Sequence, residues 1–252
     1  MVGLVLLIWG QYYAPVALGL SGAQSCLTGE VLSLNPATFP QRRWSGEVAV
    51  TAYLPAPELS WRLGGLAFSW DSLQVLQAQL MYWGWDKITH WQGGVGYGAS
   101  FFRRKVKLAV RTRALFTDFA EYGRLWRFTP DVGFQFFPLP QLVIGGYGYN
   151  LLGVGWGLLP GALRYGLGLA YAPLPTALLM AELTQEGSAN PQLHTAFLYS
   201  PHRMLHWRAG IAVPLLQIGT GIDLAYQSWR LRLAYGYQPT LGSWLAVGVA
   251  HP

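Results

Sequence analysis

Apolar residues alternate with small or polar ones over segments of strand length, from near residue 44 to the end of the chain. In 163–171, Leu and Tyr residues alternate with Arg164, two glycines and an alanine. In 229–236, Trp, Leu and Tyr residues alternate with Arg230, Arg232, an alanine and a glycine. Because successive side chains of a β-strand point to opposite faces, each segment predicts a strand with one apolar face. The opposite face is small or polar.

The low charge content indicates which environment these apolar faces require. Charged residues make up 11% of the 252 residues, whereas soluble domains carry roughly 25%. A soluble chain of this kind would expose apolar surface almost everywhere. A soluble β-sandwich would also need a charged outer face, where this chain has glycine and alanine. The composition therefore favours a membrane protein over a sandwich.

Lipid permits two architectures, helix bundles and closed β-barrels, because every backbone polar group must be satisfied internally. A membrane helix needs about 20 predominantly apolar residues. The uncharged segment 132–163 is long enough, but it contains Pro138, Pro140 and Pro160 and alternates like strands. We therefore predict an all-β fold, a transmembrane antiparallel β-barrel, with a helix bundle as the weaker alternative.

The barrel is predicted to have about fourteen strands, an even number that places both chain ends on one side of the membrane. Proline residues lie between the predicted strands, where a missing N–H removes no ladder hydrogen bond. Longer links are expected near 83–90, 117–126 and 151–160, where charge or glycine accumulates. The strands are expected to start near Ser45, Trp61, Leu73, Trp91, Lys105, Asp131, Leu142, Leu163, Ala177, Gln192, Leu205, Ile218, Trp229 and Ser243.

Charged residues fall on the strand face opposite the apolar column, and we predict that this face lines the lumen. A charge on the lipid-facing side near the bilayer midplane costs about 2–4 kcal/mol. The cations between residues 105 and 113 form a basic column on one strand, for which Glu47, Glu182 and Asp223 are candidate counterions. The alternative is a column that water screens in the barrel mouth. The charged residues expected in the lumen are Lys105, Lys107, Arg111, Arg113, Glu182, Arg208, Asp223, Arg230 and Arg232.

Aromatic residues lie preferentially at the ends of the predicted strands. Transmembrane barrels carry girdles of Trp and Tyr at both membrane interfaces. The residues expected in these girdles are Tyr53, Trp61, Trp70, Trp91, Tyr171, Trp229 and Tyr237.

The N-terminal part of the chain lacks the strand pattern and divides into two segments. Residues 1–11 begin with an apolar run that is too short to span a bilayer. They are predicted to be a signal peptide of atypical type, since no positive residue precedes the run; a buried first strand or plug is the alternative. Residues 12–43 are irregular and are predicted to form a leader that plugs the lumen. The barrel is predicted to cover residues 44–252.

No motif in the chain predicts an enzyme, a cofactor or a metal site. A hydrolase would need an assembled nucleophile, base and acid, and we favour a lumenal polar network for the candidates His194, His206, Asp223, Glu182 and Ser228. Cys26 is the single cysteine, so no internal disulfide or zinc cluster is expected. The net charge of +6 comes from scattered basic residues, and no nucleic-acid partner is expected.

The segment 18–41 resembles the N-terminal region of the FadL-like outer-membrane barrels, and most closely the PorV and PorQ-type proteins of the Bacteroidetes. Gly19, Gly22 and Ala23 match a Gly-rich segment of that family. Asn35, Pro36 and Ala37 match its Asn-Pro-Ala motif, which is expected at the turn into the first strand. The C-terminal hairpins are also similar, although the chain ends in Ala-His-Pro rather than in an aromatic residue.

This resemblance implies a non-enzymatic protein in the outer membrane of a Gram-negative bacterium. FadL-like proteins pass hydrophobic molecules through the barrel wall, and PorV and PorQ-type proteins serve type IX secretion. The implied partners are the lipid bilayer and either hydrophobic small molecules or secretion-system components. The alternatives are a structural or complex-forming barrel without transport and, more distantly, an outer-membrane hydrolase.

Overall fold

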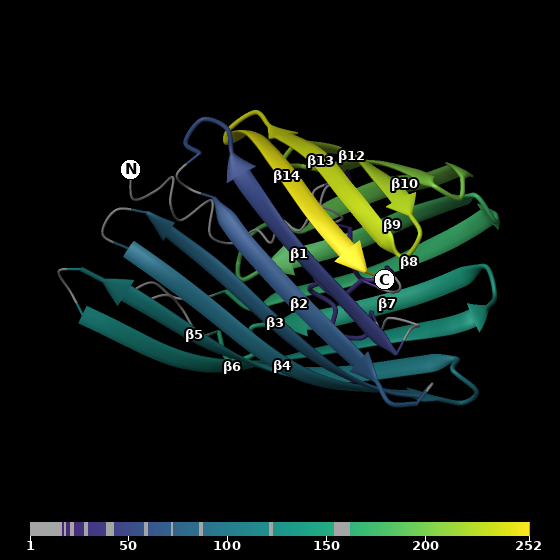
Figure 1. The fold of residues 1–252 in the computed structure, drawn as a ribbon, viewed down its shortest axis with the longest axis horizontal. Coiled ribbons are helices and arrows are strands. Elements are labelled where there is room, and N and C mark those ends of the chain that lie inside the picture. The colour runs from purple at the N-terminus through teal and green to yellow at the C-terminus, as the bar shows by residue number, and fades with distance from the viewer. Residues whose placement is uncertain are drawn as a thin grey trace.

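The computed structural model describes residues 17, 19–20, 23–27, 30–38, 43–57, 60–71, 73–85, 88–120, 123–153 and 162–251 (Figure 1). The predicted signal segment 1–11 and parts of the predicted leader therefore lie outside the described residues. The strands are β1 (Trp44–Tyr53), β2 (Trp61–Ser69), β3 (Gln74–Trp85), β4 (Ile88–Phe101), β5 (Val106–Phe119), β6 (Gly123–Leu139), β7 (Leu142–Tyr149), β8 (Arg164–Leu174), β9 (Ala177–Glu186), β10 (Gln192–His202), β11 (Leu205–Val213), β12 (Gln217–Tyr226), β13 (Trp229–Gln238) and β14 (Gly242–His251).

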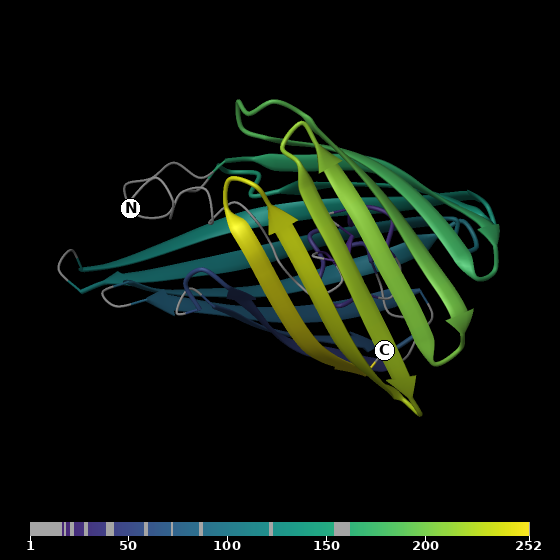
Figure 2. The same ribbon diagram turned by 90° about the horizontal axis from the view of Figure 1, so that it is seen from above.

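Each strand pairs antiparallel with the strands before and after it in the chain, and β1 pairs with β14, beside which it lies in Figure 1, to close the barrel. Figure 2 shows the same barrel from above. The closing register runs from Gly46 opposite His251 to Tyr53 opposite Trp244. Closure leaves no unpaired sheet edge, as a span through hydrocarbon requires. The predicted fourteen-strand antiparallel barrel is confirmed. No helix in the described part of the chain is long and apolar enough to cross a membrane.

The two sides of the barrel wall carry different side chains. Val95 on β4 and Val48 on β1 point outward and are 67% and 62% exposed, whereas Arg111 on β5 and Arg232 on β13 point inward and are buried. The same alternation holds along most strands, so the exterior is a nearly continuous apolar surface. Lipid solvates such a surface far better than water does.

Strands β3 to β6 are longer than the sequence predicts. The links expected near 83–90 and 117–126 are mostly strand, and β6 begins at Gly123 rather than near Asp131. The charges of Asp118 and Arg124 favour a loop, but the two residues face each other across the β5–β6 hairpin and form a 3.1 Å ion pair. In Figure 1 these long strands extend toward the left, beyond the ends of β1 and β2.

The two rims of the barrel differ in the length of their links. We call the rim where β1 begins and β14 ends the terminal rim, and the other the far rim. The turns of the terminal rim contain between two and four residues, whereas the far rim has links such as 54–60 and 150–163. In bacterial outer-membrane barrels the short turns are periplasmic and the long loops extracellular.

Candidate functional site in the barrel lumen and wall

The described residues between 17 and 38 lie inside the barrel, and all of them except Glu30 are buried. We call these residues the leader. Polar side chains of the wall bind its backbone: Gln77 donates to the Pro36 carbonyl at 2.9 Å, and Gln79 donates to the Val31 carbonyl. The leader forms no ladder with the strands, so side chains of the lumen satisfy its backbone groups instead.

The Asn-Pro-Ala motif forms a buried turn within the leader. The side-chain amide of Asn35 donates to the carbonyls of Ser25 at 2.6 Å and Phe134 at 3.2 Å, and its oxygen accepts the Ala37 N–H at 2.9 Å. Residues 39–42, which join this turn to β1, lie outside the described residues. The turn approaches β6 so closely that a Cβ on Gly133 would meet Asn35 and would lie 2.7 Å from Pro36 Cδ.

Glu182 on β9 binds the middle of the leader, next to the Ser25 carbonyl that Asn35 contacts. Its carboxylate accepts the backbone N–H groups of Gln24 at 2.7 Å and Ser25 at 2.6 Å, and its side chain is fully enclosed. Two consecutive N–H donors on one carboxylate form charge-assisted hydrogen bonds, which are stronger than neutral ones. Glu182 therefore holds the leader to the wall and is not a counterion of the basic column.

Arg111 and Arg113 on β5 share one carboxylate, that of Asp131 on β6. The distances to its Oδ2 are 2.9 Å from Arg111 Nε and 2.7 Å from Arg113 Nε, and all three side chains are buried. Arg111 also donates to the leader carbonyls of Ser33 at 2.9 Å and Leu34 at 3.1 Å. The column therefore serves two purposes, because Asp131 offsets part of its charge within the wall and Arg111 binds the leader.

Sequence reasoning missed Asp131 as a site residue because it placed the β5–β6 hairpin wrongly. Because β5 runs to Phe119 and β6 begins at Gly123, Arg111 pairs with Asp131 in the observed register. The alternation of apolar and polar residues continues through 117–126, and following it as strand would have predicted this pair. The tyrosine Tyr149 was missed as well: its hydroxyl accepts from Arg113 at 2.8 Å.

The basic column does not include the first residue that was predicted for it. Lys105 lies in the exposed β4–β5 turn and not on a strand, so its prediction as a lumen-facing residue is wrong. The hairpin closes with Phe101 opposite Val106, which leaves residues 102–105 as the loop. Lys107 is half-buried, with its ammonium 5.3 Å from the ring centre of Phe137.

A second ionic cluster lies on β1 and β11 to β13. Arg232 on β13 binds Glu30 of the leader at 2.7 Å and Glu47 of β1 at 2.8 Å. Arg208 on β11 binds Asp223 on the neighbouring β12. Arg230 is half-buried near the terminal rim. Glu47 and Asp223 thus pair with these arginines and not with the basic column.

The residues considered for a hydrolase take part in separate contacts. His194 Nε2 lies 2.8 Å from the Thr184 hydroxyl, and His206 Nδ1 lies 2.7 Å from the Ser200 hydroxyl. Asp223 faces His206 in the β11–β12 register but binds Arg208. Among the described residues, no group of three or more His, Cys, Asp or Glu side chains is placed to hold a metal ion.

An aromatic cluster lines the lumen near the far rim. The rings of Tyr53 and Trp244 have centroids 4.6 Å apart, and those of Trp61 and Trp83 stack at 5.8 Å. All four side chains are at least 95% buried, and Leu32 of the leader packs in the same cluster. Tyr53 and Trp61 were predicted in the interfacial girdle. They point inward instead, on the same strand faces as Ala49 and Leu63, respectively.

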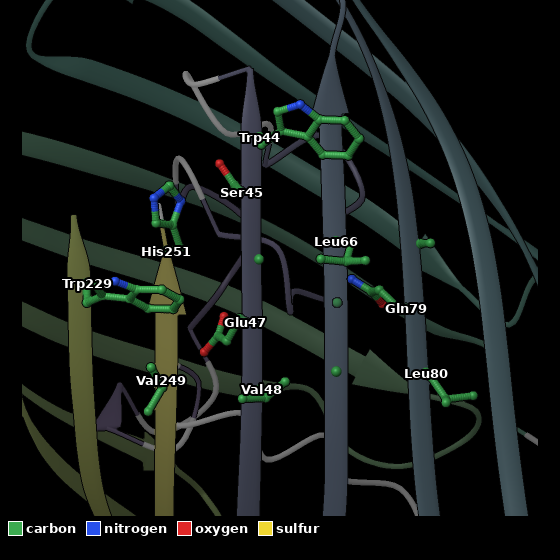
Figure 3. A pocket seen from close by; sticks show the side chains of 14 residues that line it. Trp44, Ser45, Glu47, Val48, Leu66, Gln79, Leu80, Trp229, Val249 and His251 are labelled. Atoms are coloured by element: carbon green, nitrogen blue, oxygen red, sulfur yellow. The ribbon is translucent and has the colours of Figure 1, made fainter.

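An apolar groove of about 700 Å³ lies in the outer wall across β14, β1, β2 and β3. Its floor is the backbone at Gly46 and Gly64, and outward side chains of Val48, Leu66 and Leu80 border it (Figure 3). Trp44, Trp229 and His251 stand at its end near the terminal rim. The groove exists because the outward positions of β1 and β2 lack side chains at these two glycines.

The same stretch of wall is thin on its lumenal side. Gly65 also borders the groove and faces inward, where a Cβ would lie 2.7 Å from Val31 and 2.9 Å from Leu32 of the leader. Leu32 in turn packs in the aromatic cluster. Leu32 therefore contacts both the aromatic cluster and the inner face of the Gly64–Gly65 wall, whose outer face borders the external groove. The paired backbones of β1, β2 and β3 separate Leu32 from the groove.

Comparison with known proteins identifies the fold but no family. No protein family matches the sequence, and no curated protein is detectably similar to it. Three solved structures, each 10% identical, share the fold: the toluene transporter TodX of Pseudomonas putida (TM-score 0.72, 96% of this chain and 98% of that chain), the monoaromatic hydrocarbon channel CymD (0.71, 94% and 96%) and a FadL homologue of Pseudomonas aeruginosa (0.64, 93% and 97%). The chain thus has the barrel fold of FadL-type transport proteins.

Proposed function

We propose that the protein lies in the outer membrane of a Gram-negative bacterium and passes hydrophobic small molecules through its wall. One observation carries this proposal, namely that apolar groups lie on both sides of the Gly64–Gly65 wall: the lumenal aromatic cluster and Leu32 inside, and the groove outside. The proposed route crosses the wall at these two glycines, where no side chain fills the space between them. An apolar solute gains by moving along such a route instead of through a water-filled pore. The short turns of the terminal rim support an orientation with this rim on the periplasmic side.

The leader fits the role of a plug in this proposal. Leu32 packs in the aromatic cluster, and Val31 and Leu32 cover Gly65 from inside. The ionic contacts of Glu182, Arg111 and Arg232 hold the same segment. A solute that displaces Leu32 from the cluster would therefore uncover the thin wall. Toluene and other monoaromatic hydrocarbons are the first solutes to test, since TodX and CymD carry those descriptions.

Filling the groove tests the proposal without touching the leader. Gly64 points outward, and its nearest neighbour would lie 4.0 Å from an added Cβ, so Gly64→Trp can place an indole in the groove. Gly93→Trp is the matched control, because Gly93 also points outward, on β4, with nothing within 4 Å of an added Cβ. We expect Gly64→Trp, and not Gly93→Trp, to slow toluene uptake by cells that depend on the protein. Equal uptake in both variants and the unchanged protein would contradict passage through this wall.

The resemblance to PorV and PorQ supports a second role, the presentation of secreted cargo. This role predicts that secretion-system components co-purify with the protein and that uptake of hydrophobic solutes does not depend on it. Purification from the native membrane in mild detergent distinguishes the two proposals, since transport predicts bound apolar molecules instead.

A further inference from the structure

The β4–β5 turn, Phe102–Arg103–Arg104–Lys105, has an unusual backbone. Phe102, Arg103 and Arg104 have φ values of 50°, 58° and 67°, so three consecutive residues other than glycine adopt the left-handed conformation. This conformation is unfavourable for L-residues because Cβ crowds the following carbonyl. Two hydrogen bonds fix the turn: Lys105 N–H donates to the Phe102 carbonyl at 3.2 Å, and Phe137 N–H donates to the Lys105 carbonyl at 2.8 Å.

The consequence of this backbone is a fully exposed tip on the terminal rim. All four side chains of the turn are exposed, and Phe102, at 77%, is the most exposed large apolar side chain of the described residues. An aromatic ring next to three cations is costly in bulk water but stable at a membrane interface, where one part of the group is apolar and the other hydrated.

The three cations of the turn have no carboxylate partner in the described part of the chain. Asp71 is the exposed acidic residue that the structure describes on this rim, and its Oδ1 accepts the N–H groups of Leu73 and Gln74, both at 2.7 Å. The far rim differs, because there Arg124 is paired with Asp118.

An apolar band continues from the turn along the outer wall. Phe101 and Tyr97 of β4 point outward, and Tyr97 stacks with Trp70 at a centroid distance of 6.2 Å. Acyl chains would cover this band if the barrel spans a bilayer, which places the lipid headgroups at the level of the turn. The cations and the apolar band thus fit the two halves of a single phospholipid.

We propose that this turn is a binding site for an anionic phospholipid of the leaflet at the terminal rim. Arg103, Arg104 and Lys105 bind the headgroup phosphates, and Phe102 inserts at the boundary between headgroups and acyl chains. Clusters of Lys and Arg beside a membrane attract anionic lipids through their charge, and guanidinium groups bind phosphate oxygens in bidentate geometry. The proposal depends on the membrane location of the barrel and not on its transport activity.

Native mass spectrometry of the purified barrel tests this site by titration with phosphatidylglycerol and, separately, with phosphatidylcholine. The test variant is R103Q/R104Q/K105Q, which keeps the size and polarity of the turn. The control is R62Q/R124Q, which removes two exposed cations from the far rim. Heat modifiability on gels verifies that each variant is folded.

The unchanged protein and the far-rim control should bind the first phosphatidylglycerol in preference to phosphatidylcholine. The turn variant should bind that phosphatidylglycerol roughly a hundredfold more weakly, because it lacks three basic residues that each attract the anionic lipid. Higher salt should reduce the preference, because ions screen exposed charges. Equal binding of the two lipids by the unchanged protein would overturn the proposal, as would an undiminished preference in the turn variant.

Discussion

Glu182 on β9 accepts the backbone N–H of Ser25 at 2.6 Å, across 157 positions of sequence. The same carboxylate accepts the N–H of Gln24, so a single side chain of the wall fixes two consecutive residues of the leader. Hydrogen bonds to charged groups contribute about 1.5–3 kcal/mol each. The leader is therefore held by a few strong contacts, and each contact can be removed separately.

Removing the charge of Glu182 should loosen the leader. Cys26 is the single cysteine of the chain and lies buried beside Ser25. Burial raises the pKa of its thiol to about 12, so the reactive thiolate is scarce at neutral pH. We expect Glu182→Gln to increase the rate of Cys26 alkylation by maleimide at least about tenfold, because the variant loses the charge-assisted character of two hydrogen bonds to the leader. Glu186→Gln on the same strand is the control, and an equal increase there would contradict a specific role for Glu182.

Gly133 should be required for the Asn-Pro-Ala turn to approach β6. A Cβ at this position would meet Asn35 and would lie 2.7 Å from Pro36 Cδ, closer than real contacts allow. Gly133→Ala should therefore displace the leader and expose Cys26 to alkylation, while the barrel still folds. Gly93→Ala adds the same methyl group where nothing lies within 4 Å, and Cys26 should stay protected. Full protection in Gly133→Ala would contradict the observed packing.

Asp131 should be essential for stability because it is the carboxylate partner that two buried arginines share. Asp131→Ala leaves Arg111 and Arg113 buried without their shared carboxylate, which costs about 3–5 kcal/mol for a broken buried pair. Asp118→Ala removes a half-exposed partner of Arg124 and should cost less than about 1 kcal/mol. Denaturant unfolding in detergent micelles, followed by tryptophan fluorescence, measures both. Similar losses in the two variants would refute the special role of Asp131.

The aromatic cluster should determine how well an apolar solute is taken up. Trp83→Ala removes a buried indole that stacks on Trp61 and should lower toluene uptake severalfold, since aromatic contacts contribute about 0.5–1.5 kcal/mol beyond area burial. Trp126 on β6 is exposed to the outside, so Trp126→Ala should leave uptake unchanged. Unaltered uptake in a folded Trp83→Ala protein would exclude the cluster from the route.

Much of the barrel could be predicted from its period of two. Alternation alone indicates fourteen strands, and most of their starts lie within one or two residues of the observed ones, because a pleated strand with one face in lipid cannot tolerate a shifted pattern. The misplaced elements are hairpin ends. Asp118 and Arg124 have the composition of a loop but pair across the β5–β6 ladder, and Lys105 lies in a turn although the alternation continues through it.

The candidate site was harder to predict, because most of its contacts join distant residues through the backbone of the leader. Arg111 binds the carbonyls of Ser33 and Leu34, and Glu182 binds two leader N–H groups. Backbone groups are the same for every residue type, so the sequence holds no pattern that marks them. The inward aromatic cluster was missed for another reason: girdle residues and lumenal residues near a rim have the same composition, and only the register separates Trp61 from Trp91.

Photolabelling with an aryl diazirine analogue of toluene tests the proposed route most directly. The analogue is irradiated with the barrel in lipid, and the labelled residues are located by mass spectrometry with and without excess toluene. The account predicts labels on Leu32, Trp61 and Trp83 in the lumen and on Val48 and Leu66 beside the groove, all reduced by toluene. Labels confined to lipid-facing residues elsewhere, such as Val95 and Trp126, and unaffected by toluene, would contradict a route through the lumen and the Gly64–Gly65 wall.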